Sequence, residues 1–344
     1  MNIYQESGYL DVRKIMSLGL PFNFIVGGRA TGKTYTSLET VKADGVKFIY
    51  MRRTQSQADM INKPEFSPFK SLNEDRGWNV GSASLSKYNA GFYETEETED
   101  GGRACIGSPI GYTCALSTIS NMRGFDASDV RVLIYDEFIP EKHERPIKNE
   151  GAAFLNAYET INRNRELQGK PPLQVLCLAN ANDLANPIFM ELKLVRKAEQ
   201  MRRKGQEVSI DKERGVGLFI LDKSPISSRK QQTALYKLSE GSEFNRMSLQ
   251  NDFANEELST IKSRPLTEYK PIVTVGEITI YRHKATREYY VSTHKTGSPP
   301  EYGTGETERA RFSRTFNWIW AEYMRSNIVF EEYLCEILLN KYFS

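Results

Sequence analysis

The chain has 344 residues, of which 39% are hydrophobic and 26% are charged, as expected for a globular protein with one large core and a smaller domain. No apolar run approaches the roughly 20 residues that a membrane helix needs, and residues 1–11 lack the charged-then-apolar order of a signal peptide. Four dispersed cysteines and three scattered histidines disfavour a zinc site and indicate reduced thiols in a cytoplasmic protein. The net charge of +2 means that any nucleic-acid surface must be local.

The chain begins with a mixed segment in which Tyr4 and Gln5 have two interpretations. Such side chains, upstream of a phosphate-binding loop, can stack on or hydrogen-bond to adenine, whereas simple packing is the plainer role. An apolar run at 22–26 follows and predicts the first strand of a sheet.

This strand runs into a glycine-rich turn of the form G-x-x-x-x-G-K-T, and a helix is expected after it, over 35–41. The glycines let backbone N–H groups and the helix N-terminus face a phosphate. Lys33 reaches the β- and γ-phosphates, and the Thr34 hydroxyl binds Mg²⁺. The residues that we expect to bind ATP with Mg²⁺ are Gly27, Gly28, Arg29, Ala30, Thr31, Gly32, Lys33 and Thr34. The alternative is a glycine turn with an exposed lysine.

The next segments indicate a parallel sheet with a hairpin. A second strand is predicted at 46–51, leading into the basic residues 52–53, and strand–helix–strand spacing is typical of parallel pairing. A hairpin is predicted between 87 and 117, around an acidic turn at 94–100. We interpret that turn as a solvated loop because its like charges repel one another.

Two later strands end in polar residues. The run 130–135 is nearly continuously apolar, as buried parallel strands are, and it is followed by Asp136 and Glu137. Ligands bind at the carboxyl ends of such strands, so we predict that Asp136 serves Mg²⁺ and that Glu137 polarises the attacking water. The run 174–179 ends in Asn180, which suits a γ-phosphate sensor. The alternative is an asparagine that starts a turn.

Basic side chains gather in the following part of the chain. A helix is predicted over 150–165 and a basic helical stretch over 191–204. A basic stretch is usually a solvated face, and contact with a phosphate backbone is the alternative. The residues that we predict to contact nucleic acid are Lys193, Arg196, Lys197, Arg202, Arg203, Lys204, Arg229 and Lys230.

Composition divides the chain into an α/β domain (1–227), a linker segment (228–258) and a small α+β domain (259–344). In the last domain, antiparallel strands are predicted at 271–275, 277–283 and 289–293. Two helices follow, with apolar faces formed by Phe312, Phe316, Ile319 and Tyr323 and by Phe330, Leu334 and Ile337.

The order of these motifs resembles a P-loop, additional-strand, catalytic-glutamate ATPase, in which a parallel sheet lies between helices. In more detail it resembles the DNA-packaging ATPases of small, short-tailed, protein-primed phages, which are motors like the terminase large subunits. The matching segments, in order along almost the whole chain, are 27–34, 48–54, 134–139, 163–166, 177–181, 186–187 and 247–249. The acidic turn at 94–100 looks like an insertion relative to that family.

The resemblance implies an ATP-hydrolysing motor, a ring of subunits (a homopentamer) in the host cytoplasm that pulls double-stranded DNA into a procapsid at its portal. It implies that Glu137 is the catalytic base and that Arg163 is an arginine finger for the neighbouring subunit. Arg123 stands where the family has a lysine that also acts in trans. Family members carry a degenerate RNase-H-like C-terminal domain, which we expect to be inactive as a nuclease in this chain, and some dock on a structural packaging RNA.

Two other functions stay open. A full terminase with an active C-terminal nuclease needs metal-binding carboxylates there, and no aspartate follows Asp252. A nucleotide-gated, nucleic-acid-binding scaffold without turnover would have no use for Glu137 or Arg163.

Overall fold

The computed structural model describes residues 1–99, 101–122, 126–141, 144, 147–180, 183–221, 224–242, 245 and 260–343. The chain divides into two compact units, Met1–Leu192 with Gln200–Ala254 and Lys193–Glu199 with Asn255–Ser344. Much of the predicted linker at 228–258 lies outside the described residues, so its boundaries stay a prediction. Within the described ranges, no helix is both long and apolar enough to cross a bilayer.

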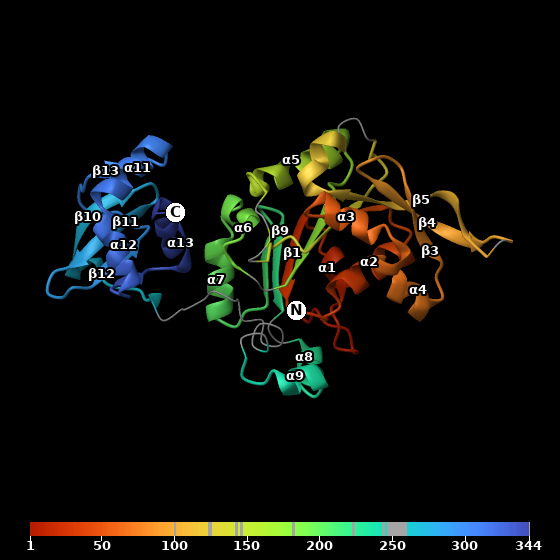
Figure 1. Ribbon diagram of the computed structural model, residues 1–344, viewed down its shortest axis with the longest axis horizontal. Helices are drawn as coiled ribbons and strands as arrows, with labels where there is room; N and C mark the ends of the chain where they lie inside the picture. The colour runs from red at the N-terminus through yellow and green to blue at the C-terminus, as the bar shows by residue number, and fades with distance from the viewer. Residues whose placement is uncertain are drawn as a thin grey trace. The chain divides into compact units, whose positions relative to one another are not determined.

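The first unit is built on a sheet that has nine strands in the described part of the chain (Figure 1). In spatial order they are β3 (Val80–Ser84), β4 (Ala90–Glu97), β5 (Arg103–Ala115), β2 (Phe48–Arg52), β6 (Val132–Asp136), β7 (Gln174–Ala179), β1 (Phe22–Gly27), β9 (Val216–Leu221) and β8 (Val208–Asp211). All neighbours from β5 to β9 pair in parallel, and the edge pairs are antiparallel. This confirms the predicted parallel α/β architecture.

The helices of this unit are α1 (Val12–Met16), α2 (Lys33–Ala43), α3 (Gln55–Ile61), α4 (Lys70–Arg76), α5 (Glu150–Asn162), α6 (Pro187–Glu191), α8 (Pro225–Lys230) and α9 (Ala234–Leu238), with short 3₁₀ turns η1 (Pro64–Phe66), η2 (Leu116–Met122) and η3 (Glu166–Gln168). Helix α7 (Val195–Arg203) is divided between the two units, with its start in the second and its end in the first. Strand β1 shows how both faces are covered, because successive side chains point to opposite sides. Ile25 joins a core cluster with Leu38 of α2, whereas the ring of Phe24 packs edge-on against Phe189 of α6.

The strand order brings the polar strand ends together. Strand β7 lies between β1 and β6, so it is the additional strand of the sheet. Because these strands are parallel, their carboxyl ends meet at one edge, where Gly27, Asp136 and Ala179 end the three strands. The predicted phosphate loop, the Asp-Glu pair and the following Asn180 therefore share one edge of the sheet.

Some predicted element boundaries in this unit are wrong. Helix α5 ends at Asn162 rather than at 165, because the Asn162 side chain accepts a hydrogen bond from the Leu173 N–H and the chain turns there. The single basic helix predicted over 191–204 is split into α6 and α7, with Lys193 between them at a φ of 56°. Strand β8 has no counterpart in the prediction.

The second unit is an α+β fold with a five-stranded sheet in the described residues. The strand order is β13 (Glu301–Tyr302), β10 (Tyr269–Val275), β11 (Ile278–His283), β12 (Tyr289–Ser292) and β14 (Ile328–Phe330). Its other elements are η5 (Leu266–Glu268), α11 (Glu306–Thr315), α12 (Asn317–Met324) and α13 (Tyr333–Phe343). The predicted antiparallel strands correspond to β10, β11 and β12.

Both predicted C-terminal helices need correction. The first is two helices, α11 and α12, because the backbone leaves the helical region at Phe316. In the second, Phe330 belongs to strand β14, which pairs with β12. The buried positions of α13 include Cys335 and Leu339 rather than the predicted Leu334 and Ile337.

Candidate active site

The loop after β1 has the geometry of a phosphate-binding loop. Gly32 caps α2 in the left-handed region, at a φ of 90°, which favours glycine. A Cβ at Gly27 would lie 2.6 Å from the Cβ of Leu221 in β9, so only glycine fits there. The loop borders a cleft of about 330 Å³ whose lining residues are Arg29, Ala30, Thr31, Gly32, Lys33, Thr34, Tyr35, Asp136, Glu137, Ala179 and Asn180.

Lys33 is buried in this cleft and is folded back onto its own loop. Its Nζ donates to the carbonyl oxygens of Gly27 at 2.9 Å and Gly28 at 2.8 Å, and to Asn180 Oδ1 at 3.3 Å. Burial lowers the pKa of Lys33 to about 8, against the opposing effect of the Asp136 carboxylate. Among the described residues, no carboxylate is in direct contact with this buried ammonium, which suits a polyanionic ligand.

We predict that nucleotide affinity depends on this lysine's protonation. A triphosphate beside Nζ raises the pKa of Lys33. Below about pH 8 the side chain is charged with and without nucleotide, whereas above it the free chain must take up a proton to bind. Affinity should therefore fall by up to about tenfold per pH unit above pH 8.

The measurement is the Kd of a fluorescent ATP analogue across this range of pH. Lys33→Arg is the control, because a guanidinium keeps its charge throughout and should remove the dependence even if binding is weaker. A wild-type affinity that is constant up to about pH 9 would contradict the assignment of Lys33.

The carboxylate of Asp136 lies opposite the loop and fits a magnesium site. Its Oδ1 accepts a hydrogen bond from the Thr34 hydroxyl at 3.0 Å. Its Oδ2 accepts one from Tyr50, whose hydroxyl pKa burial raises well above its ordinary value. A hydroxyl and a carboxylate oxygen this close are hard oxygen donors of the kind that Mg²⁺ prefers.

Arg52, which lies beside the predicted base Glu137, is the part of the site that sequence reasoning missed. Arg52 Nη1 lies 3.1 Å from Asp136 Oδ2, and Arg52 Nη2 lies 2.7 Å from Glu137 Oε2. The Arg52 side chain is 13% exposed, whereas that of Glu137 is 52% exposed on a backbone with a φ of 54°. The register between β2 and β6 explains this contact. Met51 pairs with Tyr135, so the next residues, Arg52 and Asp136, lie side by side. A correct prediction of that register would have found Arg52.

The neighbouring Arg53 holds the surrounding framework. It is fully buried and makes two hydrogen bonds to Glu150, at 2.6 and 2.9 Å, and one to Glu144 at 2.6 Å. These bonds tie the end of β2 to the start of α5 and to the loop after Glu137. Arg53 therefore positions the backbone around the site rather than entering the cleft.

The predicted trans-acting residues lie away from the cleft or outside the described residues. Arg163 follows α5, its side chain is 47% exposed, and its Nη1 lies 3.7 Å from Asp126 Oδ1. It is not among the described residues that line the cleft. Arg123 lies outside the described residues. The position of Arg163 fits a residue that serves another subunit's cleft.

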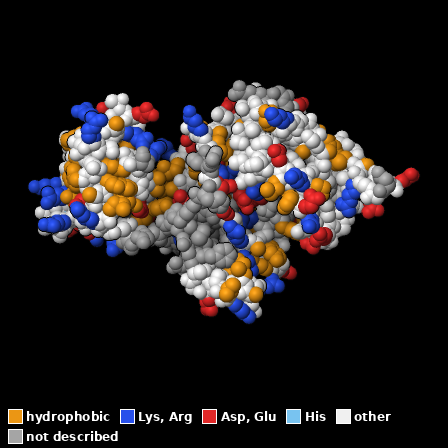
Figure 2. Space-filling view, in the orientation of Figure 1, with side chains coloured by type: hydrophobic (Ala, Val, Ile, Leu, Met, Phe, Trp, Pro, Cys, Tyr) orange, Lys and Arg blue, Asp and Glu red, His pale blue; other side chains and the backbone are white. Residues whose placement is uncertain are grey.

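Four of the eight residues predicted to contact nucleic acid lie in the first unit, either near the N-terminal segment or exposed at the end of α7. Arg229 donates to the Ser7 carbonyl at 3.0 Å and Lys230 donates to the Arg29 carbonyl, so both turn toward the N-terminal segment and the phosphate loop. Arg203 and Lys204, at the end of α7, are exposed. Over the face of the first unit in Figure 2, basic side chains are interspersed with acidic ones.

The remaining predicted basic residues on α7 and before it are Lys193, Arg196, Lys197 and Arg202. Lys193 and Lys197 are exposed, whereas Arg196 is bound to Glu332 and Arg202 carries a buried Nη1. At the N-terminus, the Tyr4 hydroxyl donates to Glu207 at 2.7 Å and the ring is buried, which favours packing over adenine contact.

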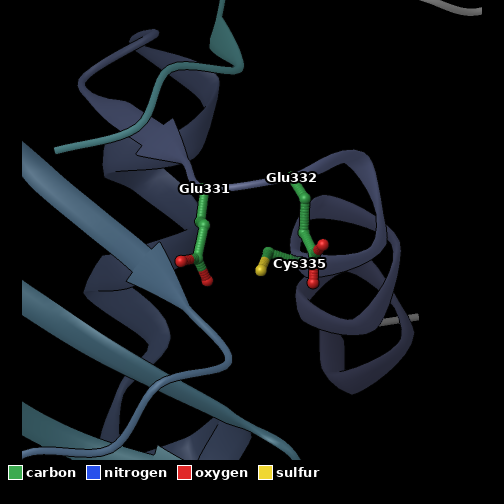
Figure 3. A group of neighbouring side chains, drawn as sticks. All are labelled: Glu331, Glu332 and Cys335. Carbon is green, nitrogen blue, oxygen red and sulfur yellow. The ribbon is translucent and has the colours of Figure 1, made fainter. Parts of the chain in front are cut away.

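The second unit contains one group of possible metal ligands in the described residues, Glu331, Glu332 and Cys335 (Figure 3). Their ligand atoms lie within 4.8 Å of one another. However, Glu331 accepts hydrogen bonds from Thr293, and Glu332 accepts two from Arg196 at 2.6 and 2.7 Å. Burial raises the pKa of the Cys335 thiol, and a neutral thiol is a poor ligand. We interpret the group as an anchor for the start of α13.

Comparisons with known proteins place this geometry in a family. The family model described as Podovirus DNA encapsidation protein (Gp16) matches residues 83–291, more than half of the chain. The DNA packaging protein of Bacillus phage phi29 is 27% identical over 264 residues, which cover 75% of this chain and 70% of that protein. The DNA packaging protein of Bacillus phage B103 is 28% identical over 248 residues, covering 70% and 67%.

Solved structures show the same fold. The bacteriophage Phi-29 viral genome packaging motor assembly contains a chain that matches with a TM-score of 0.66 at 21% identity, over 99% of both chains. The Phi-28 gp11 DNA packaging motor matches with a TM-score of 0.60 at 18% identity, over 96% of this chain and 95% of that one. These matches confirm the fold along nearly the whole chain.

Proposed function

The chain belongs to the Podovirus DNA encapsidation protein family, and from that premise we propose that it is an ATP-hydrolysing motor that moves double-stranded DNA into a procapsid. The observation that carries the proposal is the cleft in which Lys33, Thr34, Asp136 and Glu137 lie together at one edge of the sheet. Relatives named as DNA packaging proteins, and likeness to a packaging motor assembly, support DNA as the partner.

The same premise supports a ring of subunits at the procapsid portal in the host cytoplasm. A homopentamer and a structural packaging RNA are what the family resemblance implies. A ring suits the location of Arg163 outside its own cleft, since it can then reach a neighbour. Hydrolysis in one subunit would then require Arg163 of the adjacent subunit.

The residues of the cleft divide the chemistry between them. Backbone N–H groups of the loop bind the phosphates, and Lys33 must leave the carbonyl oxygens of Gly27 and Gly28 to reach them. Thr34 and Asp136 would hold Mg²⁺, which neutralises charge on the phosphates when bound. Glu137 takes the proton of the attacking water, and Asn180 contacts the γ-phosphate.

Arg52 forms an ion pair with the proposed base, Glu137. Arg52 Nη2 lies 2.7 Å from Glu137 Oε2, so this carboxylate oxygen is engaged in an ion pair and is not free to contact the attacking water. We propose that Glu137 becomes competent when Arg52 releases it, and that DNA binding favours the release. Turnover would then depend on DNA.

The test is the rate of ATP hydrolysis with procapsids, in the presence and absence of duplex DNA. Wild type should be stimulated by DNA, whereas Arg52→Ala should raise the basal rate and bring the ratio of the two rates toward one. Arg52→Lys should fall between them, because an ammonium keeps the charge without the two-pronged geometry. No DNA-dependent turnover in wild type would overturn the proposed function, and an unchanged ratio in Arg52→Ala would overturn the role of Arg52.

We propose that DNA is held through its phosphates without sequence preference, because a packaging motor must move along any sequence. Arg203 and Lys204 are exposed candidates within the first unit. Replacing both with Ala should flatten the slope of log affinity against log salt by about 1.8, if each neutralises one phosphate. Nucleotide affinity should not change.

A matched control replaces Lys63 and Lys70, which are also exposed, and should leave the slope at its wild-type value. Binding of duplexes of unrelated sequence, measured over a range of salt, gives both slopes. Equal slopes for the Arg203–Lys204 variant and wild type would place the DNA contacts elsewhere.

An active C-terminal nuclease is the weaker alternative. Within the described residues, the second unit has one group of possible metal ligands, and its carboxylates already accept hydrogen bonds from Thr293 and Arg196. No aspartate follows Asp252 in the sequence. We therefore propose that this unit does not cut DNA, and Mn²⁺-dependent nicking of a plasmid by the full chain would reverse that conclusion.

A further inference from the structure

The turn after α5, with the sequence Asn162-Arg163-Asn164-Arg165, alternates buried and exposed side chains. Asn162 is 4% exposed, and its amide donates to Glu166 Oε2 at 3.1 Å and accepts from the Leu173 N–H at 2.8 Å. Arg165 is 5% exposed. Arg163, between them, has a half-exposed side chain on a backbone with a φ of 51°. Two buried side chains therefore hold a turn that presents Arg163 outward.

The buried guanidinium of Arg165 makes a long-range connection. Its Nη2 donates to the carbonyl oxygen of Ala127 at 2.7 Å, across 38 residues of sequence. Its Nη1 has no hydrogen-bond partner in the described residues. Burial, together with the nearby Arg131, lowers the pKa of Arg165. Burying a charge carries a desolvation cost, and a single carbonyl oxygen offsets less of that cost than a carboxylate would. Stabilisation of the fold alone therefore does not explain Arg165.

The Arg165–Ala127 hydrogen bond lies next to Asp126, the residue that contacts Arg163. Asp126, next to Ala127, lies 3.7 Å from Arg163 Nη1 and is itself 70% exposed. Its Oδ1 accepts a hydrogen bond from the Ser128 N–H at 3.0 Å, which lowers its pKa and keeps it charged. An exposed ion pair of this length contributes little by itself. Of these two contacts, the buried Arg165–Ala127 hydrogen bond is the one suited to holding the two segments together.

We propose that Arg165 is a positioning residue that fixes the turn bearing Arg163 against the segment at 126–127, so that Arg163 is held ready for a neighbouring subunit's nucleotide. This inference rests on the proposed function, in which Arg163 acts in trans. A displacement of about 1 Å in a group that acts on the reacting phosphate can cost about 10²-fold in rate. The cost of losing Arg165 should thus appear in turnover and not in nucleotide binding.

The test uses Arg165→Met in the full chain, because methionine keeps much of the apolar volume and removes the donor. We expect kcat for ATP hydrolysis with procapsids and DNA to fall by about 10²-fold. The Kd for a fluorescent ATP analogue should stay near wild type. The Tm should change little, because the Ala127 carbonyl keeps its hydrogen bond from the Val130 N–H at 3.0 Å and the cost of burying the guanidinium is removed. Arg165→Lys, which retains a donor, should recover part of the rate.

A double variant separates positioning from a general structural role. If Arg165 acts through Arg163, Arg163→Ala with Arg165→Met should be no slower than Arg163→Ala alone. An additive loss, or wild-type turnover in Arg165→Met, overturns the inference while leaving the motor intact. If Arg163→Ala itself hydrolyses ATP normally, the arginine finger of the proposed function fails, and this inference fails with it.

Discussion

Glu137→Gln should bind ATP as wild type does and fail to hydrolyse it. Glutamine keeps the size of the side chain but cannot accept the proton of the attacking water, and a general base contributes about 10²–10⁴-fold to the rate. Binding should survive because the phosphate loop and Lys33 are untouched, and Lys33 faces Gly27, Gly28 and Asn180 rather than Glu137. The two measurements are the Kd for a fluorescent ATP analogue and the steady-state release of phosphate.

Lys33→Ala is the reciprocal variant. It should lose nucleotide binding, because the buried ammonium is replaced by a methyl group in a cleft built around it. Glu65→Gln is a matched control, since Glu65 is exposed and is not among the described residues that line the cleft. If Glu137→Gln released phosphate at the wild-type rate, another residue would have to be the base.

The cleft was predictable because both of its halves carry local sequence signatures. The glycine pattern around Lys33 and the apolar run ending in Asp136 each follow from a few neighbouring residues. The structure places the Thr34 hydroxyl 3.0 Å from Asp136, as a shared edge of a parallel sheet requires. The catalytic roles of these residues stay predictions until turnover is measured.

No local sequence pattern identifies Arg52 as part of the site. Its contacts depend on β2 lying beside β6 in a particular register, and nothing within a short window of sequence specifies that pairing. The end of α5 is similar, because Asn162 stops the helix through a bond to Leu173, eleven residues away. Sequence reasoning extended the helix through Arg163 because the residues before it have helical periodicity.

The second unit shows how one apolar pattern fits two structures. Phe330, Leu334 and Ile337 recur at helical spacing, which predicted one helix. In the structure, Phe330 pairs with Val291 of β12 as part of a strand, and α13 begins at Tyr333. A short apolar run such as Ile328–Phe330 suits either structure, and the free edge of β12 decides between them.

Arg163→Ala should leave nucleotide binding unchanged and reduce turnover by about 10³–10⁵-fold, the contribution of an arginine finger to phosphoryl transfer. The reason is geometric. Arg163 is not among the described residues lining its own cleft, and its side chain is half exposed beside Asp126. We therefore expect a cation placed there to stabilise transition-state charge in a neighbouring subunit rather than in its own. Arg163→Lys should recover little, because an ammonium lacks the planar fork of donors.

Mixing two inactive variants tests whether the arginine acts in trans. A subunit with Arg163→Ala has an intact Glu137 in its own cleft, and a subunit with Glu137→Gln has an intact Arg163 to offer its neighbour. Each variant alone should be inactive, whereas mixed rings should recover phosphate release, because some intact clefts then receive an intact arginine. Recovery should require complete rings and vanish on dilution below their assembly concentration. If every mixture stays as inactive as its parts while wild-type rings turn over, Arg163 acts within its own subunit and the proposed timing of hydrolysis between neighbours is wrong.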